Sequence, residues 1–345
     1  MPTSDQITEA LRTVRYPGYS RDIISFGLLK NIAINGAAVN VALQVASASA
    51  EITQQIQRDC EQVLRALPGV QSVHVEMRTT VAAAQPATSR TGQGKVAGVR
   101  RIVAIASGKG GVGKSTCSVN LACALQRLGD RVGLLDCDIY GPSIPLMMGT
   151  TARPTISAGE KMVPPVSHGV RLMSMGFLID GDAPVIWRGP MIMKTIQQFV
   201  SDVEWGELDF LLVDLPPGTG DAQLSLCQTV PLDGGVIVTT PQEASLGVVR
   251  KGMAMFEKVN VPILGIIENM SYFTSPAGER IEIFGHGGGR QEAARKKVAF
   301  LGEIPLFTEI RIGGDEGKPI TVSAPESPAA RCFIEIAQTL RQKLN

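Results

Sequence analysis

The chain has 345 residues, which is long enough for one large domain or two unequal ones with a sizeable core. Its formal net charge of +1 argues against nucleic acid or an anionic membrane surface as a partner. Because it contains neither a run of about 18 apolar residues nor a secretory signal, we expect a cytoplasmic protein whose six cysteines are reduced.

The first part of the chain predicts a small α+β domain, residues 1–79, with elements in the order α-β-β-α-β. Asn35-Gly36 between two hydrophobic runs is typical of a hairpin turn, and Pro68-Gly69 separates the second helix from the last strand. A unit of about eighty residues is large enough to fold alone. The predicted helices cover residues 5–14 and 52–67, and the predicted strands cover 23–34, 38–45 and 70–77.

A stretch rich in Ala, Gly, Ser, Thr, Gln and Pro predicts a flexible linker over residues 80–99. In residues 100–345, strands alternate with helices, which predicts an α/β domain with a doubly wound, mostly parallel sheet. Ligands of such sheets bind beyond the carboxyl ends of the strands, so motifs at those ends are the candidate site. The predicted strands cover 102–106, 131–136, 210–214, 235–240, 263–269 and a short element near 300–301.

A phosphate-binding loop follows the first of these strands. The pattern G-x-x-x-x-G-K-[ST] is matched at Gly108, Gly113, Lys114 and Ser115, and a helix predicted over 115–128 comes next, closed by Gly129. Glycines let backbone N–H groups point at phosphates, Lys114 adds positive charge, and Ser115 offers a hydroxyl to Mg²⁺. We therefore expect ATP and Mg²⁺ as cofactors. The predicted nucleotide-binding residues are Gly108, Lys109, Gly110, Gly111, Val112, Gly113, Lys114, Ser115 and Thr116.

A second lysine, Lys109, makes this loop unusual. The string Gly-Lys-Gly-Gly-Val-Gly-Lys-Ser-Thr resembles the deviant phosphate loop of the superfamily that contains nitrogenase iron protein, the arsenite-pump ATPase and MinD. The resemblance implies that Lys109 reaches the nucleotide of a partner subunit, so that hydrolysis requires a homodimer. A cation supplied across an interface stabilises the charge of phosphoryl transfer. Lys109 and Lys114 are thus predicted catalytic residues, with a solvated side chain as the alternative for Lys109.

Two carboxylates at strand ends are placed for the same chemistry. Asp214 ends the apolar run 208–213, a Walker B arrangement, and is predicted to bind Mg²⁺ together with Ser115. Asp138 is the second carboxylate of Asp136-Cys137-Asp138, and the resemblance implies that it positions the attacking water. The alternative for Asp138 is a carboxylate that caps the following turn.

Asn269 lies at the end of another predicted strand. Its amide can donate and accept at the same time, which suits a purine edge, and the resemblance implies that it reads the adenine. The alternative is a polar turn residue at a strand end.

Five further strings occur in this domain, at residues 138–145, 185–190, 213–221, 283–290 and 313–319. They resemble strings of the Mrp/ApbC iron–sulfur cluster carrier ATPases, which is a narrower resemblance than that of the loop alone. These strings extend the resemblance over nearly all of residues 100–340, and Trp187 and Arg188, within one of them, are interpreted either as part of a partner surface or as packed side chains. The first domain resembles the SufT/PaaD-like domain of iron–sulfur assembly in residues 25–29 and 67–70.

The chain departs from this family at one place that matters for iron. Carriers of this type commonly bear Cys-x-x-Cys shortly after Met-Ser-Tyr-Phe, but here Met270-Ser-Tyr-Phe273 is followed by Thr-Ser-Pro-Ala-Gly-Glu-Arg. Serine is a poor substitute for thiolate on iron. An iron–sulfur cluster is therefore a possible cargo whose ligands the sequence does not identify. Among the six cysteines, Cys227 is the best candidate for a cluster ligand, and the alternative is that it is a buried core thiol.

The resemblance implies a slow, dimer-dependent ATPase that carries or assembles iron–sulfur clusters and transfers them to apoproteins. The alternative is an ATP-dependent switch of the MinD or partition type that organises protein partners without a cluster. The near-zero net charge argues against the DNA-partition version of that alternative. A metabolic kinase is the third class, but no acceptor site is visible in the sequence.

Overall fold

The fold comes from a computed structural model, which describes residues 2–14, 22–25, 28–45, 50–79, 95–139, 141–178, 189–218 and 220–344. The chain divides into two compact units, Met1–Ser89 and Arg90–Asn345, each with its own hydrophobic core. Most of the predicted linker, together with Trp187 and Arg188, lies outside the described residues.

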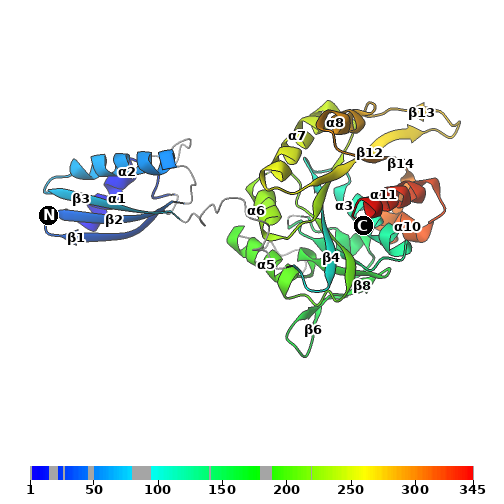
Figure 1. Cartoon of the computed structure of the whole chain (residues 1–345), viewed down its shortest axis with the longest axis horizontal. Coiled ribbons are helices and arrows are strands. Elements are labelled where there is room, and N and C mark those ends of the chain that lie inside the picture. The colour runs from blue at the N-terminus through cyan, green and yellow to red at the C-terminus, as the bar shows by residue number, and fades with distance from the viewer. Residues whose placement is uncertain are drawn as a thin grey trace. The chain divides into compact units, whose positions relative to one another are not determined.

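The first unit has the predicted order of elements. The sheet order is β1-β2-β3, with β1 and β2 antiparallel around Gly36, which has a positive φ of 65°. β2 and β3 are parallel, and α2 connects them and packs on β3 and α1 (Figure 1). The elements are α1 (Ser4–Leu11), β1 (Leu29–Asn35), β2 (Ala38–Val45), α2 (Ala50–Arg65) and β3 (Ser72–Thr79).

The strand predicted over 23–34 is wrong in its first part. Residues 22–25 form a turn in which the Asp22 carboxylate accepts hydrogen bonds from the Ser25 backbone N–H (2.8 Å) and hydroxyl (2.7 Å). Ile23 is buried, and its N–H donates to the carbonyl oxygen of Val14 (3.0 Å). An Asx turn therefore stands where the apolar pattern alone suggested a strand, because an Asp side chain can satisfy the backbone locally.

The second unit contains a large, mostly parallel sheet. Its strand order is β13-β12-β11-β4-β10-β5-β9-β8, with β14 also paired to β12. Each strand predicted in this part of the chain is present, and the predicted doubly wound α/β fold is confirmed. Near the edges β13 and β8 are antiparallel to their neighbours. The bounds are β4 (Val99–Ser107), β5 (Val132–Asp136), β8 (Val166–Ser167), β9 (Val170–Ser174), β10 (Leu208–Asp214), β11 (Gly234–Thr239), β12 (Ile263–Thr274), β13 (Arg280–Ile281) and β14 (Phe300–Leu306).

Helices cover both faces of this sheet (Figure 1). α3 (Lys114–Arg127) and α11 (Pro328–Leu344) pack together on one face, and α7 (Glu243–Lys258) covers the other with α6 (Asp221–Thr229) beside it. α3 ends in a Schellman motif, since Asp130 N donates to Leu125 O and the αL residue Gly129 donates to Gln126 O. The remaining helices are α4 (Ile144–Met147), α5 (Gly189–Ser201), α8 (Gly288–Lys296), α9 (Thr308–Asp315), α10 (Ile320–Ser323) and a 3₁₀ helix, Met175–Leu178.

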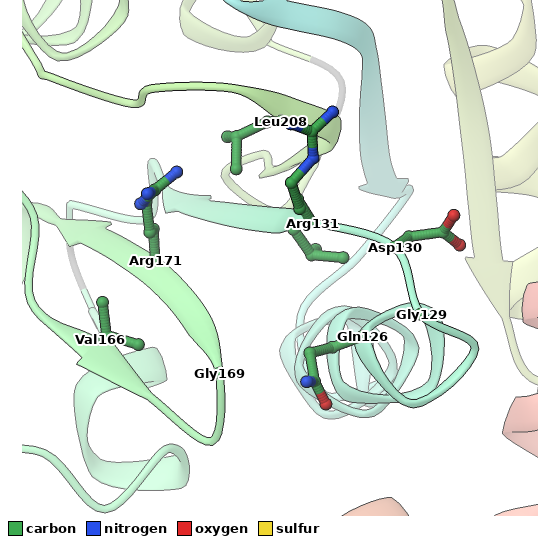
Figure 2. A pocket seen from close by; sticks show the side chains of 9 residues that line it. Gln126, Gly129, Asp130, Arg131, Val166, Gly169, Arg171 and Leu208 are labelled. Carbon is green, nitrogen blue, oxygen red and sulfur yellow. The ribbon is translucent and has the colours of Figure 1, made fainter.

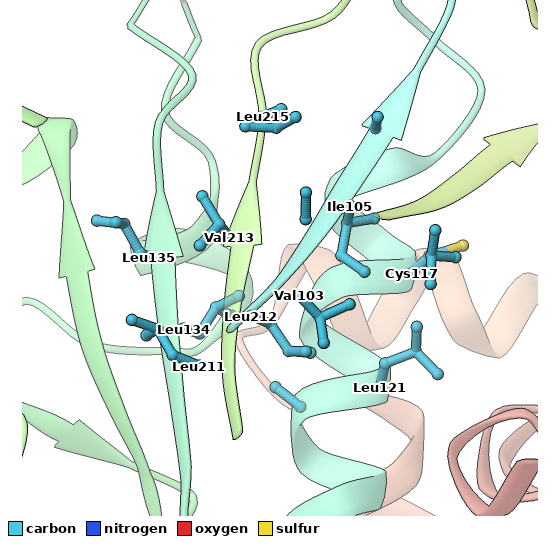
Figure 3. Close-up of a cluster of buried hydrophobic side chains, with 14 of the residues drawn as sticks. Val103, Ile105, Cys117, Leu121, Leu134, Leu135, Leu211, Leu212, Val213 and Leu215 are labelled. Carbon is cyan, nitrogen blue, oxygen red and sulfur yellow. The ribbon is translucent and has the colours of Figure 1, made fainter. Parts of the chain in front are cut away.

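Part of the core of the second unit lies between the central strands and α3 (Figure 3). Val103 on β4, Leu134 on β5 and Leu212 on β10 are fully buried, as are Cys117 and Leu121 on α3. Strands covered on both faces contain nearly continuous apolar runs, which is why they were recognisable in the sequence. Their rigid packing fixes the position of whatever follows at their carboxyl ends.

Some elements of the second unit were not predicted. β9 extends the sheet beyond β5, and β6 (Thr155–Ile156) and β7 (Met162–Val163) form a small hairpin. Prolines at 154, 164 and 165 and the two-residue length of several strands interrupt any hydrophobic period. Among the helices in the described part of the chain, none is both long and apolar enough to cross a membrane.

Candidate functional site

The carboxyl ends of three neighbouring strands meet at one edge of the large sheet. β4 leads into the loop at 108–113, β10 ends at Asp214, and β5 ends at Asp136. β10 lies in the middle, with Asp214 in register with Ile105 on β4 and with Asp136 on β5. The parallel topology thus brings the predicted loop and the predicted acidic residues together, although they are far apart in the sequence.

The loop depends on glycine at defined positions. Gly111 and Gly113 both have φ of +79°, a left-handed conformation that favours glycine. A Cβ added at Gly113 would lie 2.2 Å from Asn269 Nδ2, whereas one added at Gly110 or Gly111 would meet no atom within 4 Å. The loop is therefore packed against the protein at its end and open in its middle. α3 begins directly after it, so the N-terminus of a 14-residue helix faces the same space.

The Asp214 carboxylate accepts hydrogen bonds from three side chains, those of Lys114, Ser115 and Ser118. Its Oδ2 accepts hydrogen bonds from Lys114 Nζ (2.5 Å) and Ser115 Oγ (2.7 Å). Lys114 and Asp214 form an ion pair with side-chain exposures of 5% and 0%. A buried ion pair is stable only when further hydrogen bonds satisfy it, and the serine hydroxyls supply them. Three of the predicted site residues are thus in direct contact.

Ser118 is a contact that the sequence analysis missed. Its hydroxyl donates to the other oxygen of Asp214, Oδ1 (2.6 Å), and also lies 3.1 Å from the carbonyl oxygen of Lys114. Ser118 is completely buried on α3, one turn after Lys114. It holds the carboxylate so that Oδ2 faces Lys114 and Ser115. A polar residue among the apolar residues of α3 was the only available signal.

Asp136, the first carboxylate of its pair, is the more deeply placed. Its Oδ1 accepts the backbone N–H of Asp138 (3.0 Å), and its Oδ2 accepts the Ser174 hydroxyl (2.9 Å) and the Ile144 N–H (3.4 Å). Burial raises the pKa of Asp136 to about 7, and the neighbouring charge of Asp214 contributes to the rise. Asp136 therefore organises the turn that carries Asp138.

Asp138 and Lys109 lie on loops beside these buried groups. Asp138 Oδ1 accepts the N–H of Gly141 (3.3 Å), so the turn-capping contact considered for this residue is present. Lys109 accepts a hydrogen bond from the Ser107 hydroxyl at its carbonyl oxygen (3.0 Å), and the residue is half-buried. Their predicted roles concern a water molecule and a second subunit, so both stay predictions.

Asn269 contacts the phosphate loop directly. It is 7% exposed, and its Nδ2 donates to the carbonyl oxygen of Val112 (2.9 Å). Contrary to the strand predicted over 263–269, β12 continues to Thr274, with a kink at Met270, where φ is +53°. The position of Asn269 gives it a role in holding the loop. Recognition of the adenine remains a prediction.

The segment after Met270 forms a β-hairpin. Phe273 pairs with Ile281 and Thr274 with Arg280, and Ser275 N donates to Glu279 O (2.8 Å) to close the turn. This turn occupies the place where the resembled carriers have their cysteines. Across the described ranges, no group of three or more His, Cys, Asp and Glu side chains is arranged to hold a metal ion.

The cysteines do not offer reactive thiolates. Five of the six are buried, and Cys332 is intermediate. Burial raises the pKa of Cys227 to about 12, which fits the alternative of a core thiol. The pKa of Cys137 is raised well above its ordinary value, first by burial and then by the charges of Asp136 and Asp214. These thiols are therefore protonated near neutral pH.

The residues at the strand ends fit a magnesium–nucleotide complex. A carboxylate oxygen and a serine hydroxyl are the hard oxygen ligands that Mg²⁺ prefers, and here they contact each other at Asp214 Oδ2. Lys114 contacts the same carboxylate oxygen, and glycines 110 and 111 of the same loop have open space around them. When bound, ATP would supply the scissile phosphoanhydride bond, and its Mg²⁺ would neutralise part of the phosphate charge. The chain itself supplies a positive charge, a helix N-terminus and positioned oxygens.

A separate pocket of about 350 Å³ lies at the amino ends of β5 and β10 (Figure 2). Arg131 and Arg171 project toward the same side of it. Arg131 is paired with Asp209 (both contacts 3.1 Å), and Arg171 donates to the carbonyl oxygen of Trp205 (2.6 Å). Because both cations already have partners within the protein, we assign this pocket no part in nucleotide binding.

The chain matches two protein-family models. Residues 98–341 match the family described as NUBPL iron-transfer P-loop NTPase, and residues 4–77 match the family described as iron–sulfur cluster assembly protein. An iron–sulfur cluster carrier protein of Synechocystis sp. is 44% identical over 100% of this chain and 99% of its own length. A mitochondrial iron–sulfur protein required for NADH dehydrogenase, from Arabidopsis thaliana, is 49% identical over 74% of this chain and 82% of its own length.

Solved structures of nucleotide-binding proteins are similar to the second unit of the chain. A nucleotide-binding protein from Archaeoglobus fulgidus, in complex with ADP, is 39% identical and superimposes with a TM-score of 0.61 over 69% of this chain and 94% of its own. The cell division ATPase MinD of Pyrococcus furiosus gives a TM-score of 0.53 over 70% of this chain and 98% of its own, at 23% identity. The MinD likeness establishes the fold alone.

Proposed function

The chain belongs to the NUBPL iron-transfer P-loop NTPase family, and from that premise we propose that it is an ATP-hydrolysing carrier of iron–sulfur clusters. In this proposal it acts in the cytoplasm as a homodimer and transfers clusters to apoproteins. One observation carries the proposal. A complete Lys114–Ser115–Asp214 contact set lies in a chain whose two parts both match iron–sulfur families.

Each residue of the site has a part in the proposed hydrolysis. Lys114 compensates phosphate charge, while Ser115 and Asp214 would hold Mg²⁺. Asp138 positions the attacking water, and Lys109 reaches the partner's nucleotide. Turnover should be slow, at about 1 s⁻¹ or below, because an ATP-bound state that controls a partner has to persist.

The cluster is the cargo of this reaction, and the residues present do not fit a tight site for it. Residues 274–278 offer no thiolate, and the pKa of Cys227 is raised by burial. We therefore expect the isolated protein, after anaerobic reconstitution with iron and sulfide and then desalting, to retain well below about four irons per dimer. Iron counting and visible absorbance check this, with ATP hydrolysis measured on the same sample as the control for folding.

A stable cluster with about four irons per dimer would contradict this prediction. Loss of that cluster in Cys227→Ser, with the protein still folded, would then identify Cys227 as a ligand. Retention of the cluster in that variant would exclude Cys227.

The role of Asn269 can be resolved by comparing two nucleotides. If it reads the adenine, Asn269→Ala should weaken ATP binding more than GTP binding and so reduce selectivity by about tenfold, the worth of one or two hydrogen bonds. If it only holds Val112, both nucleotides should weaken by the same factor. Affinities measured by calorimetry decide between these outcomes, and we expect selectivity to fall.

A second candidate function is an ATP-dependent switch that organises protein partners without a cluster. The segment directly after Phe273, residues 274–280, contains no cysteine, which favours this function, and the likeness in fold to MinD is compatible with it. The two functions differ in what they act on. A carrier accelerates cluster formation in an apo-ferredoxin supplied with iron and sulfide, which the recipient's visible absorbance reports. A switch leaves that rate unchanged.

A further inference from the structure

We propose that Ser174 is a positioning residue for ATP hydrolysis, acting through Asp136 on the turn that carries Asp138. This inference rests on the proposed ATPase activity of the site. Ser174 ends β9, a strand that lies parallel to β5, and its partner in the register is Asp136 itself. The sheet therefore places one serine directly beside one carboxylate, away from the nucleotide loop.

The contacts of Ser174 connect two segments. Its hydroxyl donates to Asp136 Oδ2 (2.9 Å) and accepts the N–H of Gly176 (2.9 Å), and the residue is only 1% exposed. A Cβ added at Gly176 would lie 3.2 Å from Pro142, so the 3₁₀ helix that contains Gly176 packs against the turn after Asp138. Ser174 thus lies where this turn, β5 and the 3₁₀ helix meet.

The Asp136 carboxylate binds the backbone at both ends of the turn. Its Oδ1 accepts the N–H of Asp138 (3.0 Å), and its Oδ2 accepts the N–H of Ile144 (3.4 Å) at the start of α4. Without the Ser174 hydroxyl, Oδ2 would keep only the longer of its two contacts. Loss of this donor leaves a buried carboxylate oxygen poorly satisfied, which costs free energy, and the orientation of the Asp136 side chain is then no longer fixed. The backbone at Asp138 would then lose its anchor.

The arrangement repeats the one found at Asp214. There a buried serine, Ser118, fixes one oxygen of the carboxylate and leaves the other to face Lys114. Here Ser174 fixes Oδ2 of Asp136 while Oδ1 holds Asp138. Each acidic strand end of the site therefore has its own hydroxyl anchor, and neither serine is among the residues predicted to bind nucleotide.

The test compares Ser174→Thr with Ser174→Val. These side chains have nearly the same shape, so any packing damage is matched, and only threonine keeps the hydroxyl. We expect the Val variant to have a kcat about tenfold below that of the Thr variant, because it lacks one hydrogen bond to a carboxylate. The two variants should bind a non-hydrolysable ATP analogue with affinities within about twofold of each other. Ser201→Ala, an exposed serine on α5, should behave as wild type. Equal kcat values for Thr and Val would overturn the proposal.

A second measurement separates this inference from the proposed function. Backbone hydrogen exchange over residues 136–147 should be faster in Ser174→Val than in Ser174→Thr, because the N–H groups of Asp138 and Ile144 lose a fixed acceptor. Thermal melting confirms that both variants are folded. If the wild type hydrolyses no ATP, the proposed function fails, yet the exchange comparison still decides the role of Ser174. Identical exchange in the two variants would overturn that role.

Discussion

Replacing Lys114 by alanine is expected to abolish nearly all ATP hydrolysis. Its ammonium group lies 2.5 Å from Asp214 Oδ2 in a buried pair at the end of the phosphate loop. The substitution removes the positive charge that compensates the phosphates and leaves a buried carboxylate without its counter-ion. The loss of one such electrostatic contact lowers kcat by about 10²–10³. Phosphate release under saturating Mg·ATP measures it.

The same substitution also destabilises the fold, so a loss of ATP hydrolysis has to be distinguished from unfolding of the protein. Breaking a buried ion pair by removing one partner costs about 3–5 kcal/mol. Lys114→Met, which keeps most of the side-chain volume, and thermal melting of both variants control for unfolding. Lys161→Ala removes an exposed lysine in the turn before β7 and should leave turnover unchanged. Wild-type activity in a folded Lys114→Ala protein would show that residues 108–116 are not the active loop.

Neither Lys109→Ala nor Asp138→Ala should hydrolyse ATP alone, yet a mixture of the two should recover part of the activity. The expectation follows from the deviant loop, in which Lys109 acts on the nucleotide of the partner subunit. In a mixed dimer, one of the two sites receives Lys109 and Asp138 from different chains and is therefore intact. Nucleotide binding should persist in both variants, because Lys114, Ser115 and Asp214 are unchanged.

The complementation experiment needs proof that mixed dimers form. Two different affinity tags, with sequential purification, isolate dimers that contain one chain of each kind. We expect these dimers to reach up to about half of the wild-type rate, since one site in two is complete. Purified mixed dimers without activity would show that Lys109 does not act across the interface.

Local sequence signals predicted the nucleotide loop and Asp214 for a physical reason. The loop needs glycine at Gly113, where φ is +79°, and a lysine and a hydroxyl directly after it. Asp214 follows a strand buried on both faces, which appears in the sequence as a continuous apolar run. The residues that meet these requirements are neighbours in the sequence, so a sequence motif is enough to identify them.

The anchors of these residues could not be predicted, because tertiary contacts create them. Ser118 lies 96 positions from Asp214 in the sequence, and Ser174 lies 38 from Asp136. β9, which presents Ser174, has five residues and follows a region with several prolines. A single serine at the end of a short strand has no distinguishing pattern. Only the register of β9 against β5 shows what it contacts.

The same limit applies to the segment around Asn269. The apolar pattern ends there, so the sequence placed a strand end at 269, but pairing with β14 and β13 carries β12 on to Thr274. The kink at Met270 and the contact from Asn269 to Val112 depend on these partners. Propensity and periodicity give the type of an element more reliably than its end, because the end is set by tertiary pairing.

The most direct test of the proposed function is the ATP dependence of cluster delivery. The rate of holo-ferredoxin formation from apo-ferredoxin, iron and sulfide is measured anaerobically, with wild-type protein or Lys114→Ala and with or without Mg·ATP. We predict that wild-type protein accelerates delivery, that ATP changes its rate, and that Lys114→Ala shows no response to ATP. A wild-type protein that hydrolyses ATP but leaves the delivery rate at its uncatalysed value, with and without ATP, would contradict the carrier function.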